Sequence, residues 1–161
     1  MRASIMIHAV ILIAMFISYR ANSQTVTDSM LFNNLVAQYT HSIDQADTVL
    51  GSEVWSNTDE VSFINPRGNE YGWNGVKNIY IFFRDNFTTR KLTFFDLKFA
   101  DYGNVAWMEF YWIFDATLKM NNSPVQTKGR ETQIWRKVNS EWRLVHVHYS
   151  GMPDPGQGQD L

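Results

Sequence analysis

Residues 104–114 read NVAWMEFYWIF, a run of aromatic and apolar residues that predicts a β-strand. Successive side chains of a strand point to opposite faces of the sheet. The run therefore has two faces, one with Val105, Trp107, Glu109, Tyr111 and Ile113, and the other with Ala106, Met108, Phe110, Trp112 and Phe114. Both faces are mainly apolar, whereas an antiparallel strand with one wet face alternates polar and apolar residues, so this strand requires cover on both sides.

The rest of the chain has a helical half followed by an extended half. Apolar residues recur at three- and four-residue spacing over residues 28–47, which predicts an amphipathic helix. Further elements are expected as helices over 48–55 and 75–87 and as strands near 61–64, 92–101, 104–118, 124–138 and 141–150. Helices followed by a meander of long strands predict an α+β domain in which one curved sheet wraps over the helices.

Two kinds of cover are available for the strand at 104–114. The helices of the same domain can cover one face, and we assign to them the face of Trp107 and Tyr111. The face of Phe110 and Trp112 would then be a large exposed apolar patch, so we expect a second subunit to cover it. A bulge within the strand would exchange the two faces. The sequence therefore predicts a homodimer or a larger oligomer.

The first 23 residues have the composition of an export signal. Arg2 precedes an apolar run over residues 5–17, and Ala21 and Ser23 are the small residues that a signal peptidase requires. The run is shorter than the roughly 20 apolar residues that cross a bilayer. We therefore expect cleavage before Gln24 and a secreted or periplasmic mature protein that has no membrane partner.

Charge and cysteine content narrow the possible partners of the mature chain. Without residues 1–23 the chain has 12 basic and 16 acidic residues, a net charge of about −4, which disfavours nucleic acid as a partner. It has no cysteine, so a packed core rather than disulfides must stabilise it. One domain is expected over residues 24–153, followed by a disordered tail over residues 154–161 that is rich in Gly, Gln and Asp.

Two sets of polar residues stand on the last two strands. His146 and His148 share a strand face, as ligands of a metal can. A third ligand is missing from the pattern, so hydrogen bonds across the sheet or at a dimer interface are the alternative, and we expect no metal. Glu131 and Gln133 share a face with Trp135, and polar residues of this kind normally make cross-strand contacts. No phosphate-binding loop precedes a helix, and we expect no cofactor.

The ends of these strands resemble a known family. Residues 131–135 (ETQIW), 141–142 (EW) and 145–153 (VHVHYSGMP) are similar to the closing hairpin of the association (hub) domain of calcium/calmodulin-dependent protein kinase II. That domain belongs to the SnoaL-like, nuclear transport factor 2-like (ketosteroid isomerase-like) superfamily. The resemblance extends from about Leu31 to Pro153. It implies a cone-shaped, cystatin-like fold in which three helices pack in a strongly curved, mostly antiparallel sheet, with a deep pocket and with subunits paired through the outer sheet face.

The resemblance also implies positions for a site. Tyr39 falls where ketosteroid isomerase has its oxyanion-hole tyrosine, and Asn65 falls where that enzyme has its general base. An asparagine cannot accept a proton as a carboxylate does, so isomerisation by that route is disfavoured unless Glu109 substitutes. The arginines of the hub pocket match Ile113, Gln133 and Tyr149 here, which favours a more neutral ligand.

Glu109 is the carboxylate that the strand pattern singles out. It has Trp107 and Tyr111 on either side on the same face, so a face directed into the cone would bury it in an apolar cleft. Such burial would raise its pKa towards a value useful for acid or base catalysis. The alternative is a structural ion pair with Arg130 or Arg143.

Three functions remain open on this reasoning. The leading hypothesis is a binding protein for a small, largely apolar or aromatic ligand. The second is a cofactor-free isomerase, lyase or cyclase that acts on a carbonyl substrate with Glu109 and Tyr39 as catalytic residues. The third is an oligomeric scaffold without a ligand. The residues expected to bind the ligand are Trp55, Asn65, Trp107, Tyr111, Gln133, Trp135 and Tyr149.

Overall fold

A computed structural model of the chain describes residues 27–152. The predicted export signal and the predicted C-terminal tail lie outside the described residues, and both stay predictions. The chain divides into two units, residues 1–34 and residues 35–161. The described residues 27–34 of the first unit are helical, and the second unit contains every element discussed below. No helix within the described residues is long and apolar enough to cross a membrane.

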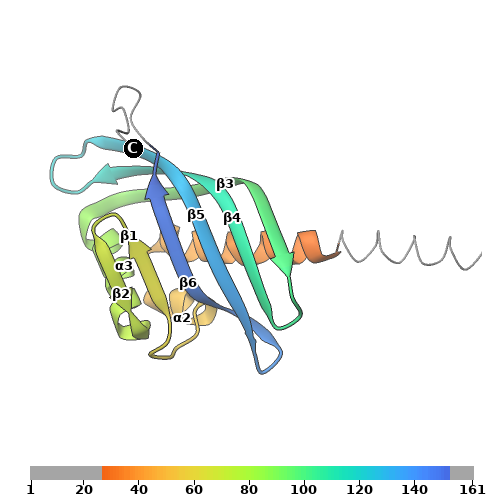
Figure 1. The fold of residues 1–161 in the computed structure, drawn as a ribbon. Helices are drawn as coiled ribbons and strands as arrows, with labels where there is room; N and C mark the ends of the chain where they lie inside the picture. The colour runs from red at the N-terminus through yellow and green to blue at the C-terminus, as the bar shows by residue number, and fades with distance from the viewer. Residues whose placement is uncertain (1–26, 153–161) are drawn as a thin grey trace, which may run out of the picture. The chain divides into compact units, whose positions relative to one another are not determined.

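The second unit combines helices with a six-stranded sheet (Figure 1). Its elements in chain order are helical residues 35–45, α2 (Thr48–Val54), β1 (Ser62–Asn65), β2 (Gly68–Tyr71), α3 (Gly72–Asn86), β3 (Phe87–Asp101), β4 (Val105–Leu118), β5 (Pro124–Val138) and β6 (Glu141–Gly151). The four long strands and the three helices occur where the sequence predicts them. The structure adds β2, and it starts α3 at Gly72 and β3 at Phe87, both earlier than expected.

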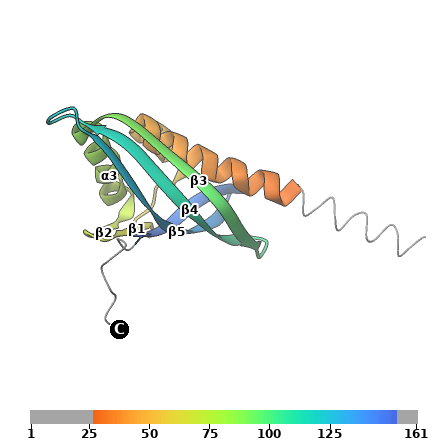
Figure 2. The same cartoon turned by 90° about the horizontal axis from the view of Figure 1, so that it is seen from above.

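The sheet curves over α3. Its strand order is β2-β1-β6-β5-β4-β3, and every neighbouring pair is antiparallel except β1 and β6, which are parallel. α3 contacts β1 and β2 near one edge of the sheet and β3 at the other edge. Figure 2 shows the long strands bending as they pass from one side of the unit to the other. The prediction of an α+β, cone-type fold with a curved, mostly antiparallel sheet is confirmed.

The two faces of β4 are the reverse of our assignment. Met108, Phe110 and Trp112 are buried, whereas Glu109 and Tyr111 are exposed. We call the side of Phe110 and Trp112 the inner face of the sheet and the side of Glu109 and Tyr111 the outer face. The expectation that a second subunit covers Phe110 is therefore wrong, because the core of the same unit already covers it.

Neighbouring strands, rather than a bulge in β4, decide which face is buried. The pairing of β4 with β5 has no register shift, so the alternation along β4 is unbroken. On the inner face, Phe94 of β3 packs against Phe110 with ring centroids 5.8 Å apart. On the outer face, β4 residues pair with charged residues: Glu109 pairs with Lys98, and Tyr111 pairs with Arg130. A sheet buries the face that is apolar across several strands, which a single strand cannot reveal.

The helices of the second unit meet at the hydroxyl group of Tyr80 on α3. This oxygen accepts a hydrogen bond from Trp55 Nε1 at 3.1 Å and lies 3.0 Å from Ser42 Oγ. α2 approaches closely because Gly51 has no side chain, and a Cβ at this position would lie 2.7 Å from Tyr80 Cζ. The close approach at Gly51 and the bonds of Tyr80 therefore hold the three helical segments in one arrangement.

Candidate functional site

A cavity of about 820 Å³ opens on the inner face of the sheet. This volume is in the range of small-molecule sites. Its walls are largely apolar and aromatic, and they are formed by Ile43, Phe63, Ile79, Phe82, Phe83, Phe87, Leu92, Trp112, Phe114 and Tyr149. Part of the wall is a packed aromatic cluster in which the ring of Phe114 lies 5.2 Å from that of Phe83 and 5.5 Å from that of Phe87.

Tyr39 and Glu131 are the polar residues at the buried end of this cavity. Tyr39 comes from the first helix and Glu131 from β5, and their exposed fractions are 2% and 4%. Burial raises the pKa of Glu131 to about 8, although hydrogen bonds with Gln133 and Tyr39 act in the opposite direction. Burial, the charge of Glu131 and their hydrogen bond raise the pKa of Tyr39 well above its usual value. The two side chains therefore form one buried hydrogen-bonded pair.

A row of side chains on β5 fixes the orientation of Glu131. Trp135 Nε1 donates to Gln133 Oε1 at 2.8 Å, and Gln133 Nε2 donates to Glu131 Oε1 at 2.8 Å. An indole nitrogen can only donate, so Trp135 determines which end of the Gln133 amide faces Glu131. One oxygen of Glu131 is thereby held as an acceptor, and the other oxygen is left for Tyr39 or for a ligand.

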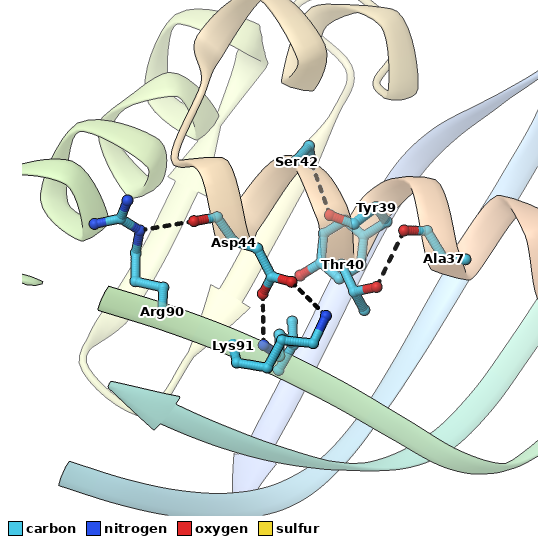
Figure 3. Close-up of polar contacts among 8 residues, drawn as sticks. Ala37, Tyr39, Thr40, Ser42, Asp44, Arg90 and Lys91 are labelled. Carbon is cyan, nitrogen blue, oxygen red and sulfur yellow. Dashed lines mark hydrogen bonds and ion pairs between the residues drawn. The ribbon is translucent and has the colours of Figure 1, made fainter. Parts of the chain in front are cut away.

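The helix that carries Tyr39 is attached to β3 by Asp44 (Figure 3). The Asp44 carboxylate accepts from the backbone N of Leu92 at 2.5 Å and from Lys91 Nζ at 2.8 Å. Arg90 Nε donates to the backbone O of Asp44 at 3.0 Å. These contacts join the helix to the strand one turn beyond Tyr39, so they position the Tyr39 hydroxyl relative to the sheet.

The mouth of the cavity includes the turn between β1 and β2. Asn65 Oδ1 accepts a hydrogen bond from the backbone N of Arg67 at 2.9 Å, which shapes the turn. The Arg67 guanidinium lies over the ring of Phe82, 5.3 Å from its centroid. Both Asn65 and Arg67 line the cavity. Asn65 is therefore near the expected position, but its side-chain oxygen is occupied by the turn.

Three of the expected site residues lie elsewhere. Trp107, Glu109 and Tyr111 are on the outer face, outside the cavity. The Glu109 side chain is 48% exposed and pairs with Lys98 at 3.4 Å, so the expected apolar cleft around it is wrong, and its ion-pair partner is neither of the two arginines considered. Tyr111 stacks on Phe95, with ring centroids 5.7 Å apart. The cause is the reversed assignment of the two faces of β4.

The remaining predicted residues divide between the cavity and the layer behind it. Tyr39, Asn65 and Tyr149 line the cavity. Trp55, Gln133 and Trp135 are fully buried outside its lining, and each has its polar group hydrogen bonded. Glu131 was not expected among the site residues, because polar neighbours on one strand face, such as Glu131 and Gln133, normally make cross-strand contacts. Its shared face with Trp135 was the signal that could have identified it, since a carboxylate beside a buried tryptophan is itself buried.

The two histidines of β6 have separate environments. His146 Nδ1 lies 2.7 Å from Ser62 Oγ on β1, so the alternative of a hydrogen bond across the sheet is confirmed for His146. Burial and the neighbouring His148 lower its pKa. His148 is exposed beside Thr132. Among residues 27–152, no group of three potential ligands is placed to hold a metal ion.

Known proteins with this fold were identified by sequence and by structure. The SnoaL-like domain family matches residues 32–155. A nuclear transport factor 2 (NTF2-like) superfamily protein from Salmonella enterica serovar Typhimurium has 37% identity and a TM-score of 0.78, covering 85% of this chain and 99% of that chain. No curated protein sequence is significantly similar to the chain.

Two further solved structures are similar in fold at low sequence identity. A hexachlorocyclohexane dehydrochlorinase (LinA) type 2 has 10% identity and a TM-score of 0.69, covering 81% of this chain and 96% of that chain. A protein with a cystatin-like fold from Caulobacter vibrioides has 15% identity and a TM-score of 0.64, covering 77% of this chain and 88% of that chain.

Proposed function

The chain belongs to the SnoaL-like family, and we propose that its cavity binds a small, largely apolar molecule whose carbonyl oxygen accepts hydrogen bonds from Tyr39 and Glu131. The observation that carries this proposal is the placement of these two groups at the buried end of an apolar cavity of about 820 Å³. An open cavity of this size also favours a ligand over a scaffold role that needs none.

The protonation states suit a carbonyl oxygen. With a pKa of about 8, Glu131 keeps its proton at neutral pH, and Tyr39, with its raised pKa, keeps its own. Each group then carries one O–H. Tyr39 donates its own to Glu131, so a carbonyl oxygen binds to both groups when the Tyr39 O–H turns from Glu131 to the ligand. Donors that point into an apolar site with little water bind an oxygen atom more strongly than they would in water, most of all when that oxygen gains negative charge. The apolar walls contribute the rest of the binding free energy.

A matched pair of ligands tests this proposal. 2-Acetylnaphthalene has the carbonyl group, and 2-isopropenylnaphthalene has nearly the same shape without the oxygen. We expect Tyr39→Phe to weaken binding of the ketone about tenfold while leaving the hydrocarbon unchanged, because a single hydrogen bond is lost. Tyr102→Phe is the control, since it removes an exposed hydroxyl that does not line the cavity, and binding of both ligands should stay as in wild type. Equal losses for both ligands, or no binding of either, would contradict the proposal.

Catalysis is a second candidate function that one observation favours. The pKa of Glu131 is about 8, and a group with a pKa near neutrality transfers protons most effectively there. We propose a cofactor-free isomerase, lyase or cyclase in which Glu131, rather than Glu109, works with Tyr39 on a carbonyl compound. Exchange of the methyl protons of 2-acetylnaphthalene in D₂O should then be faster with the protein than in buffer, and Glu131→Gln should abolish the increase. If exchange in the presence of the protein proceeded at the buffer rate, the catalytic proposal would be excluded and only the binding proposal would remain.

We further propose that the protein is exported and forms a homodimer through the outer face of the sheet. The dimer proposal is supported by large apolar residues that are exposed on three neighbouring strands of this face, namely Phe95, Val105, Tyr111 and Ile134. A second copy of the chain would bury them. The export proposal rests on the composition of residues 1–23.

A further inference from the structure

Arg67 is a cation at the mouth of the cavity that has no ion-pair partner within residues 27–152. The turn geometry set by Asn65 and the contact with the Phe82 ring hold its side chain beside the opening. Charged groups on a protein surface usually contribute little to folding stability, so stability alone does not explain why Arg67 is held in this position. An arginine fixed at the entrance of an apolar cavity is instead well placed to bind a negatively charged group.

The charge of Arg67 reaches into the cavity. Burial and the charge of Glu131 raise the pKa of Tyr149 above its usual value, and the positive charge of Arg67 offsets part of this rise. Tyr149 pairs with Glu131 across β5 and β6, so one side chain responds to both the buried carboxyl group and the guanidinium. The cavity therefore has a donor pair at its buried end and a positive charge near its mouth, with aromatic walls in between.

A second donor in the wall also lacks an acceptor. Trp112 lines the cavity, and its buried Nε1 has no hydrogen-bond partner within the described residues. The Trp112 ring packs edge-on against Tyr149, with centroids 5.5 Å apart. Buried donors are normally paired, but this nitrogen has almost no accessible surface, and the ring edge beside it packs against Gly129 of β5, so the ligand class follows from Arg67, Tyr39 and Glu131.

The acid nearest to the mouth is directed elsewhere. Glu70 also lines the cavity, but one of its carboxylate oxygens lies against Gly75, so close that a Cβ there would be 3.1 Å from it. This position is in the first turn of α3, where the helix N-terminus favours negative charge. Within residues 27–152 Glu70 forms no ion pair with Arg67, and its position beside the N-terminal turn of α3 favours its negative charge there, so Arg67 is left for a ligand.

We propose that the ligand is a keto acid with an apolar, cyclic body, whose carboxylate binds Arg67 while its carbonyl binds Tyr39 and Glu131. This inference rests on the proposed function and extends it by defining the chemical class of the ligand. It differs from the sequence-based expectation of a neutral ligand because Arg67 occupies none of the positions from which that expectation came.

The test uses two probes that differ in charge and in one methyl group. 6-Acetyl-2-naphthoate has both polar groups, and its methyl ester has the same carbonyl and body without the charge. We expect the wild-type protein to bind the acid about tenfold more tightly than the ester at neutral pH, because the acid gains a charge-assisted hydrogen bond. Arg67→Gln should remove this preference, and Arg67→Lys should restore part of it. Arg84→Gln is the control, since Arg84 is exposed on α3 outside the cavity.

The outcomes separate this inference from the proposed function. If the ester binds as tightly as the acid, or if Arg67→Gln keeps the preference for the acid, the carboxylate assignment is overturned. 2-Acetylnaphthalene, which has no carboxylate, reports on the proposed function alone, because its binding depends on Tyr39 and it lacks the group that Arg67 would bind. If the wild-type protein bound none of the three ligands, the proposed function itself would be overturned.

Discussion

Replacing Glu131 by glutamine removes a titratable group from the core while preserving its shape. The carboxyl group is buried, and its pKa is about 8 in the folded state against an ordinary value of 4.5. Glutamine can still accept the hydrogen bond from Gln133 Nε2, and its own NH₂ can donate where the protonated carboxyl group did. The substitution therefore isolates the free energy of ionising this one group.

The sign and size of the effect follow from the two pKa values. Between pH 4.5 and about 8, the folded protein keeps a proton that the unfolded chain has lost. The stability from this protonated group is complete below 4.5 and is lost as the pH rises through about 8. The full difference between the two pKa values corresponds to about 5 kcal/mol in the free energy of unfolding, of which about 3 kcal/mol is already lost at neutral pH. Relative to wild type, Glu131→Gln should therefore gain about 1.4 kcal/mol for each pH unit in this range.

Urea unfolding of both proteins, followed by tryptophan fluorescence at several pH values from about 5 to 9, measures this difference. Groups that titrate in both proteins, such as His146, cancel in the comparison. Glu109→Gln is the matched control, because it makes the same substitution at a glutamate whose side chain is 48% exposed on the outer face. If the free-energy difference between Glu131→Gln and wild type stays constant over this range, Glu131 is not a buried, protonated acid and the reasoning is refuted.

Three other predictions concern packing, assembly and export. Gly51→Ala should lower the free energy of unfolding by about 1–3 kcal/mol, because the new Cβ would lie 2.7 Å from Tyr80 Cζ. This clash should outweigh the better helix propensity of alanine. A variant that is more stable than wild type in urea unfolding would disprove the close packing. Tyr111→Glu places a charge in the proposed interface and should yield a folded monomer in sedimentation velocity. Phe110→Glu should unfold the protein instead, because Phe110 is in the core. A folded wild-type monomer at micromolar concentration would exclude the dimer. N-terminal sequencing of the secreted or periplasmic protein should begin at or near Gln24, and detection of Met1 would count against export.

Several properties of this protein follow from the sequence alone. The order of helices and long strands follows from local periodicity, because apolar residues recur every three or four positions in the helices and every two in the strands. The α+β class and the curved sheet could therefore be predicted. Tyr39 could be placed near the site by resemblance to ketosteroid isomerase, whose oxyanion-hole tyrosine it matches. Tyr149 and Asn65 could be placed by resemblance to the family. Each of these inferences uses neighbours along the chain or a matched motif.

The tertiary structure alone decided which face of β4 is buried. Glu109 and Phe110 alternate on a strand that is apolar on both sides, and only the residues that β3 and β5 place beside them distinguish the faces. The same pairing put Glu131 opposite Phe110 on the inner face and moved the candidate acid from Glu109 to Glu131. Arg67 likewise reaches the cavity only because β1 pairs with β6. These facts depend on strand register and on contacts between distant segments, which local sequence patterns do not encode.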